Sequence, residues 1–136
     1  MSIVRINNLG ITDGTIVNAD INASAGITLA KLSGVNDAKA WVNFNGQGTP
    51  SIRGSFNVTS IVDNGTGLFG VNLTNALTDT NYAIVVNSGL SGSSGDSGRT
   101  MATGNVVTTS LCAINTKNSN TGTLEDYALN CVALFR

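Results

Sequence analysis

An aliphatic residue recurs about every five positions between residues 11 and 32 of this chain, at Ile11, Ile16, Ile21, Ile27 and Leu32. An α-helix places its apolar stripe at steps of three and four residues, and a straight strand at steps of two. Because five is an odd number, a continuous strand would place successive aliphatic side chains on opposite faces. The spacing therefore predicts short extended pieces separated by turns near Gly14, Asn18 and Gly26.

Such a segment has one apolar line and almost no core of its own. Copies of the chain around a symmetry axis are the simplest cover for that line. We therefore expect residues 1–35 to form a short extended stem or attachment arm, with its five aliphatic residues facing the axis of a homo-oligomer. The alternative is an arm that lies against its own globular domain.

The composition limits the partners of the chain. Charged residues make up only 11% of the 136 residues, against about 25% in an average protein, and the net charge is −1. The seven basic residues are scattered and the pI is about 5.0, which argues against nucleic acid as a partner. No run has the length of a signal peptide or of a membrane helix, so we expect synthesis in the cytosol and no membrane insertion.

Seven strand-like runs follow in residues 36–136. In the first, Ala40, Val42 and Phe44 share one face, opposite Trp41 and Asn43, although a tryptophan in such a strand usually belongs to a core. The runs cover residues 38–46, 52–65, 67–75, 81–87, 100–110, 110–117 and 124–135, with a hairpin turn at Asp63-Asn64-Gly65. Without a helical period, they predict an all-β chain whose residues 36–136 form an antiparallel, jelly-roll-like β-sandwich head.

Short sequence patterns known from enzymes occur in this chain, but the residues that their chemistry requires do not accompany them. The chain has no histidine, so the serine in Gly95-Asp96-Ser97-Gly98 has no imidazole to activate it. The glycines of residues 65–70 satisfy a dinucleotide-binding pattern, but a strand follows them instead of a helix. No pair of carboxylates is singled out for acid–base chemistry. We therefore expect no enzyme activity, no cofactor and no metal, with a loop calcium site as the open alternative.

The two cysteines, Cys112 and Cys131, both lie in strand-like runs. We expect buried free thiols, and the sequence leaves a disulfide open.

Several phrases resemble segments of tail-fibre and related structural proteins of bacteriophages, including phages of cyanobacteria and marine bacteria. The phrases are AWVNFNG (40–46), IRGSFNVTSIVDNGTG (52–67), VNLTNAL (71–77) and NYAIVV (81–86), preceded by GTIVNADINASAGITLAKLSG (14–34), which is similar to shaft or attachment segments. The resemblance implies a β-rich, usually trimeric component of the virion.

Two structural roles follow from this resemblance. The first is a short trimeric tail fibre or knob, whose N-terminal segment binds other virion proteins and whose head contacts a host surface glycan or protein. The second is a decoration protein that stabilises the capsid, which suits the unusual shortness of the chain. In both, the protein is made in the host cytoplasm and resides on the tail or the capsid surface.

Two loops are the candidate contacts with a host receptor, residues 91–99 and residues 116–123. In the first, Asp96 and Arg99 supply charge. In the second, Asn118 and Asn120 supply amide donors and acceptors suited to sugars. Neither loop carries the aromatic platform expected of a carbohydrate site, and Trp41 is the one tryptophan available for it.

Overall fold

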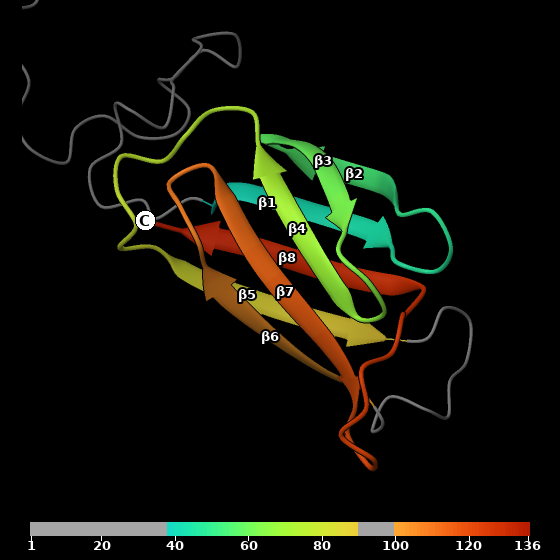
Figure 1. The fold of residues 1–136 in the computed structure, drawn as a ribbon. Helices are drawn as coiled ribbons and strands as arrows, with labels where there is room; N and C mark the ends of the chain where they lie inside the picture. The colour runs from blue at the N-terminus through green and yellow to red at the C-terminus, as the bar shows by residue number, and fades with distance from the viewer. Residues whose placement is uncertain (1–37, 90–99) are drawn as a thin grey trace, which may run out of the picture. The chain divides into compact units, whose positions relative to one another are not determined.

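The computed structural model describes residues 38–89 and 100–136, and within them eight strands (Figure 1). The chain divides into two units, Met1–Val35 and Asn36–Arg136. The stem predicted at Ile11, Ile16, Ile21, Ile27 and Leu32 lies outside the described residues and stays a prediction. The strands are β1 (Ala38–Asn45), β2 (Ser51–Phe56), β3 (Val58–Asp63), β4 (Leu68–Leu73), β5 (Ala83–Gly89), β6 (Thr100–Val106), β7 (Leu111–Asn118) and β8 (Leu129–Phe135).

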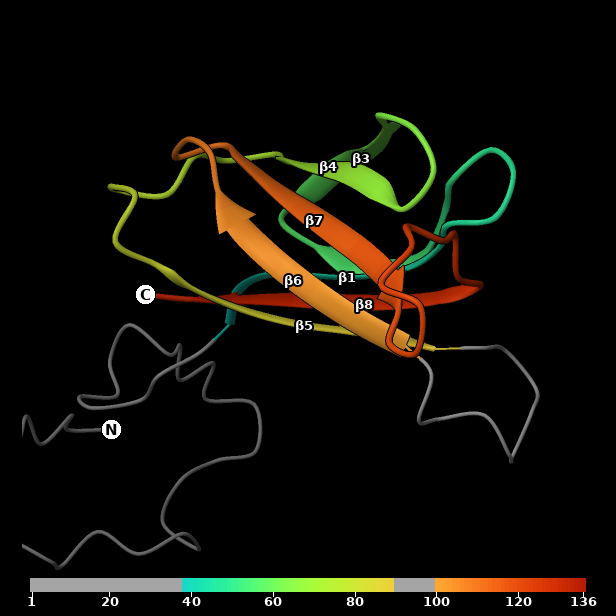
Figure 2. The same ribbon diagram turned by 60° about the horizontal axis from the view of Figure 1, so that its bottom comes forward.

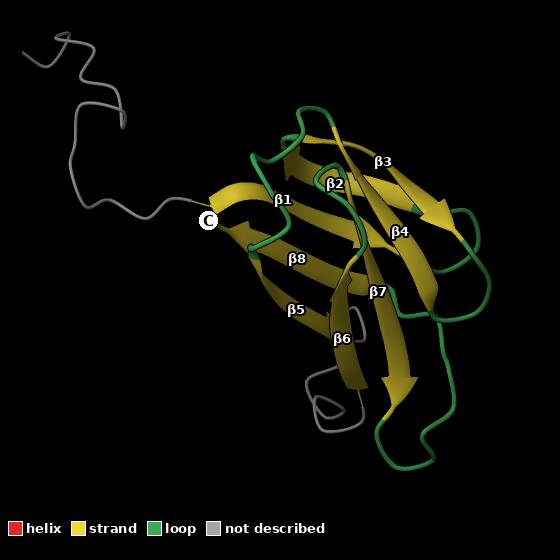
Figure 3. Ribbon diagram, turned by 60° about the vertical axis from the view of Figure 1, so that its left-hand side comes forward, coloured by secondary structure: helices red, strands yellow, loops and turns green. Residues whose placement is uncertain are grey.

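The strands form two four-stranded antiparallel sheets that face each other (Figure 2). Sheet 1 has the order β2-β1-β8-β5, and sheet 2 has the order β3-β4-β7-β6. The described residues contain strands and loops without a helix, as Figure 3 shows. The predicted all-β sandwich is thereby confirmed. The first and last strands, β1 and β8, pair at the centre of sheet 1, so the sandwich closes only when the end of the chain has been added.

The core lies between the inner faces of the two sheets. Alternation along β1 buries Ala40, Val42 and Phe44, which the sequence had placed on one face, and Phe69 and Val71 of β4 face them. The rings of Phe44 and Phe69 meet edge to face, with centroids 5.3 Å apart and planes at 73°. Full burial of such side chains contributes about 1.5–3 kcal/mol each, which makes this contact between sheets a main source of stability.

Asn57 turns the chain from sheet 1 to sheet 2. The sequence predicted one run over residues 52–65, but Asn57 has a φ of 55°, which ends β2 and starts β3 in the other sheet. Phe56 is consequently 55% exposed while Val58 is buried, although a continuous strand would place them on one face. The side chain of Asn57 fixes the corner: Nδ2 donates to the carbonyl of Lys39 (3.0 Å), and Oδ1 accepts from the amide of Asn75 (2.8 Å).

The last predicted run, residues 124–135, is a strand only from Leu129 onward. Tyr127 precedes the strand and is buried, with its hydroxyl donating to Glu125 Oε2 at 3.0 Å. Within β8 the inward side chains are Asn130, Val132 and Leu134. Cys131 and Ala133 therefore lie on the outer side of sheet 1.

Strand β6 packs closely on β5 where the two sheets meet. A Cβ on Gly104 would stand 2.5 Å from Cγ2 of Ile84 and 2.9 Å from Cγ2 of Val86. Both of these side chains pack against the core. Only glycine allows this approach, so Gly104 helps to close the edge of the sandwich.

The predicted hairpin at Asp63-Asn64-Gly65 joins β3 to β4. Asp63 Oδ1 accepts the amide of Gly65 at 2.9 Å, and Asn64 donates its amide to the carbonyl of Leu68 at 2.9 Å. The positive φ of Gly65, 119°, explains why the loop requires a glycine there.

Candidate functional site

The outer face of sheet 1 carries a row of apolar side chains across all four strands, and those from β2, β1 and β5 are exposed. The register places Phe56 of β2 beside Trp41 of β1, Trp41 beside Ala133 of β8, and Ala133 beside Val85 of β5. Trp41 is 42% exposed and Val85 is 58% exposed. The expectation that Trp41 belongs to the core is therefore wrong. The alternation that buries Val42 directs its neighbour Trp41 outward.

The indole ring of Trp41 lies over Gly54 of β2. Its Cη2 and Cζ3 atoms are 3.5 Å from the point where a Cβ on Gly54 would stand. The register pairs Gly54 with Asn43, one row along from the pair of Trp41 with Phe56. The absence of a side chain on Gly54 leaves room for the indole ring of Trp41, which remains 42% exposed.

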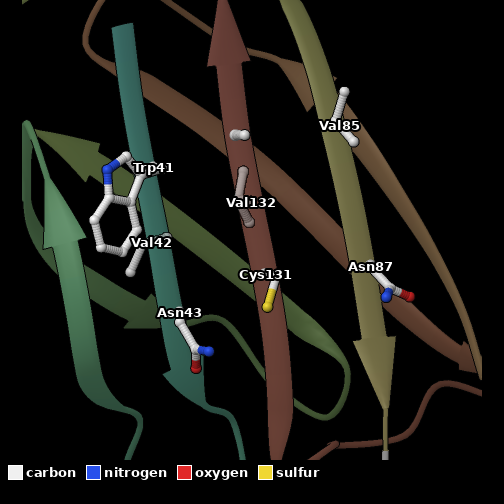
Figure 4. A pocket seen from close by; sticks show the side chains of 8 residues that line it. Trp41, Val42, Asn43, Val85, Asn87, Cys131 and Val132 are labelled. Atoms are coloured by element: carbon white, nitrogen blue, oxygen red, sulfur yellow. The ribbon is translucent and has the colours of Figure 1, made fainter. Parts of the chain in front are cut away.

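A groove of about 350 Å³ runs beside this ring along β8. Its floor consists of small side chains, Cys131 and Ala133. Figure 4 shows β1 contributing one wall and β5 the other. Because β8 carries small residues between strands with larger ones, the hollow follows directly from the sequence of the central strand. The lining residues are Trp41, Val42, Asn43, Val85, Asn87, Cys131, Val132 and Ala133.

Two amide side chains face each other across Cys131, because the register aligns Asn43, Cys131 and Asn87. Asn43 Oδ1 accepts a hydrogen bond from Nη1 of Arg53 at 3.4 Å. Asn87 is exposed. The side chains that line the groove are uncharged, and the exposed guanidinium of Arg53 reaches its edge at Asn43.

Of the two predicted receptor loops, the second, residues 116–123, lies within the described residues. Asn118 ends β7, where its Nδ2 donates to Glu125 Oε2 (3.2 Å) and its Oδ1 accepts from the amide of Asn120 (3.0 Å). Asn118 thus holds the shape of its own loop, whereas Asn120 is exposed. Thr116, the predicted start of that loop, is instead buried in β7 and donates to the carbonyl of Glu125 at 2.6 Å.

Asp96 and Arg99 lie outside the described residues, together with the rest of the first predicted loop. Asn118 ends β7 of sheet 2 and Asn120 lies in the turn that follows, whereas the groove lies on the outer face of sheet 1. The groove is therefore a site that the loop prediction did not contain.

The four carboxylates in the described part of the chain each accept hydrogen bonds within the fold. Asp63 and Asp79 accept from backbone amides two residues ahead, as expected for turns, and Asp126 Oδ1 accepts the amide of Gly67 at 2.6 Å. Glu125 accepts from Asn118 and Tyr127. No group of three potential metal ligands occurs among the described residues. These acids stabilise loops.

The two cysteines are free and lie on different sheets. Cys112 of β7 is fully buried, and this burial raises the pKa of its thiol to about 11. Cys131 is half-buried on the outer side of sheet 1, in the floor of the groove. The expectation of a buried thiol thus holds for Cys112 and is wrong for Cys131.

Comparison with protein-family models, curated proteins and solved structures gives no match to this chain. The described residues also include no helix long and apolar enough to cross a bilayer.

The sequence pattern placed Trp41 and Asn43 on one face of their strand, but it assigned Trp41 to the core and did not connect the two residues with β5 and β8. The usable signal was the pair of small residues at Cys131 and Ala133, which alternate with inward Val132 and Leu134. The missing information was the strand order that brings β5 next to β8.

Proposed function

We propose that this chain is a non-enzymatic structural protein of a bacteriophage particle, a short trimeric tail fibre or knob whose head contacts the host surface. The phage-fibre-like phrases carry this proposal, because they fall on strands of the sandwich. AWVNFNG falls on β1, IRGSFNVTSIVDNGTG on β2 and β3, VNLTNAL on β4, and NYAIVV on β5. The resemblance therefore covers strands β1 to β5 of the head and is not confined to one loop.

Two features of the described residues support a structural role. The carboxylates hold loops, as described above, and the ion pair of Arg136 with Asp79 ties the end of β8 to the loop before β5. The low charge of the chain leaves little repulsion between copies packed around an axis. In the proposed assembly, residues 1–35 form the stem, the head stands on it, and other virion proteins hold its N-terminal part.

A capsid decoration protein is the second candidate. The exposed row of Phe56, Trp41 and Val85 favours it, because such a row on a sheet face suits contact with a shell subunit. In that arrangement the N-terminal arm lies on the shell.

The proposal is tested by asking whether the chain is part of the particle. Phage particles that encode it are purified through a density gradient, and their proteins are quantified by mass spectrometry. We expect the chain to band with the particles in a copy number divisible by three. As a control, the purified chain is mixed with particles that lack its gene and run through the same gradient. A chain that stays in the soluble fraction of the infected lysate would contradict the proposal.

A further inference from the structure

Asparagine followed by glycine occurs twice in the chain, at Asn45-Gly46 and at Asn64-Gly65. The first dipeptide ends β1 and opens the connection to β2, and the second lies in the hairpin between β3 and β4 (Figure 1). In such a dipeptide the backbone nitrogen of the glycine can attack the side-chain carbonyl carbon of the asparagine, because no Cβ hinders its approach. Since both sites have the same two residues, their surroundings in the fold determine which one reacts.

The surroundings of Gly46 oppose the reaction at Asn45. Gly46 is buried, and its amide donates to the carbonyl of Tyr127 at 3.0 Å. A Cβ on Gly46 would stand 2.8 Å from both Nδ2 of Asn130 and Cζ of Phe69, so the backbone here lies tightly against its neighbours. To attack Asn45, the nitrogen of Gly46 would have to leave its hydrogen bond inside the protein, where no water replaces the lost partner.

The surroundings of Gly65 leave the reaction at Asn64 open. Both residues are exposed, and no described atom outside the adjoining residues lies within 4 Å of the position that a Cβ on Gly65 would take. The amide of Gly65 donates to Oδ1 of Asp63 at 2.9 Å, in an exposed hydrogen bond that water can replace. The side chain of Asn64 can therefore turn toward the nitrogen of Gly65 without displacing core atoms.

The reaction needs only hydroxide and water. Hydroxide removes the amide proton of Gly65, and the nitrogen forms a bond to Cγ of Asn64. The bond from Cγ to Nδ2 breaks, and this nitrogen takes up a proton from water and leaves as ammonia. Water then opens the five-membered imide at either carbonyl, which gives aspartate or isoaspartate. One water is consumed and one ammonia is released overall, without oxidation or reduction.

We propose that Asn64 is a site of spontaneous modification, which converts to aspartate or isoaspartate in the folded protein while the fold protects Asn45. The product carries a carboxylate next to Asp63 and adds one negative charge to a chain of net charge −1. Isoaspartate also adds one carbon to the backbone of the turn, where Asn64 and Gly65 both bond to Leu68. The modification thus changes the charge and the shape of an exposed hairpin. This inference is independent of the proposed function.

Peptide mass spectrometry of the full-length protein, incubated at pH 8 for several days, measures both sites. Trypsin separates them because Arg53 lies between the two dipeptides, and a sample digested at the start corrects for conversion during digestion. We expect Asn64 to convert at least tenfold faster than Asn45, since reaction at the buried site requires local unfolding. In urea, where both dipeptides are exposed, the two rates should become similar.

Two matched variants test the assignment through charge, with the acidic species that forms during incubation resolved by ion-exchange chromatography. Asn64→Gln keeps a side-chain amide but would need a less favourable six-membered ring, so the acidic species should form at least threefold more slowly. Asn45→Gln makes the same change at the protected site and should leave the rate as it is in the unchanged protein.

Three results would overturn the proposal. The first is conversion of Asn45 at a rate similar to that of Asn64 in the folded protein. The second is no conversion of Asn64 over a time in which the protein in urea converts at both sites, since the hairpin would then protect Asn64 as well. The third is an acidic species that forms as fast in Asn64→Gln as in the unchanged protein.

Discussion

At the scale of single residues, the clearest contrast lies between the two thiols. Cys112 points into the core and Cys131 toward solvent, because they occupy opposite sides of their sheets. At pH 8 a thiol reagent should therefore modify Cys131 in the native protein and leave Cys112 unmodified, since a pKa of about 11 keeps the Cys112 thiol protonated and burial blocks access.

Mass spectrometry of peptides from the labelled protein measures both sites. In denaturant the two cysteines should react at similar rates, which serves as the control. Native labelling of Cys112 as fast as Cys131 would show that the core opens where the structure has it closed.

The stability that Asp79 contributes to the fold should depend on pH. The amide of Asn81 and the guanidinium of Arg136 hold the pKa of Asp79 below its ordinary value of 3.8. A carboxylate whose pKa is lower in the folded than in the unfolded protein stabilises the fold above that ordinary value. This contribution is lost as the pH falls below 3.8, through the lowered pKa.

Asp79→Asn keeps an oxygen for the amide of Asn81 but removes the charge that pairs with Arg136. We expect a slightly lower thermal midpoint than in the unchanged protein at pH 7, and a difference that shrinks toward zero at pH 2. A constant difference across this range, measured by circular dichroism, would show that the charge of Asp79 is not the cause.

At the scale of strands, Asn57 decides how the chain changes sheets. Alanine at this position would lose the side-chain hydrogen bonds to Lys39 and Asn75 and retain an unfavourable φ of 55°. Glycine would lose the same bonds but adopt this φ freely. Because the left-handed region costs about 1–2 kcal/mol for a residue with a Cβ, Asn57→Gly should be more stable than Asn57→Ala by about 1 kcal/mol.

Urea denaturation of the two variants measures this difference. The expected order is the reverse of that for an ordinary strand position, where alanine is the more stable residue by about 0.5–1 kcal/mol. A more stable alanine variant would mean that Asn57 does not form the corner described here.

The same strands show how far local pattern predicts this fold. Alternation identified the run that forms β1 and placed Ala40, Val42 and Phe44 on one face, which the structure shows to be the inner one. It could not reveal the corner at Asn57, since one asparagine among many carries no local mark of a positive φ. The pattern also predicted a strand from residue 124 onward, whereas β8 begins at Leu129. Tyr127 continues the apolar residues at every second position, although it lies in the loop before β8.

The candidate site was harder to predict from the sequence than the fold was. Its two walls lie more than forty residues apart in the chain, at Trp41 and Val85, and its floor comes from Cys131 and Ala133. Their meeting depends on the pairing of β8 with both β1 and β5. Such long-range pairing is set by the packing of the whole sandwich and leaves little trace in any short window of sequence.

At the scale of the whole molecule, the proposed trimer depends on the aliphatic line of residues 1–35. Replacing both Ile16 and Ile21 with Asp would place two carboxylates per chain at the proposed apolar axis, where an unpaired charge is costly. We expect the assembly to dissociate to single chains of 13.9 kDa while the head keeps its thermal transition.

Multi-angle light scattering of the full-length protein measures this change in mass. Replacing the polar neighbours Asn18 and Asn22 with Asp adds the same charge outside the aliphatic line and should leave the mass unchanged. A mass that is the same for the Ile16 and Ile21 variant as for the unchanged protein would contradict a stem built on a symmetry axis.

The position of this chain in the intact phage particle, determined by cryo-electron microscopy, tests the proposed fibre or knob most directly. We expect density on the tail that fits three copies of the sandwich around one stem, with the outer face of sheet 1 accessible to the host. Density spread over the capsid surface would contradict the fibre or knob and favour the decoration protein. The absence of this sandwich from the particle would contradict both.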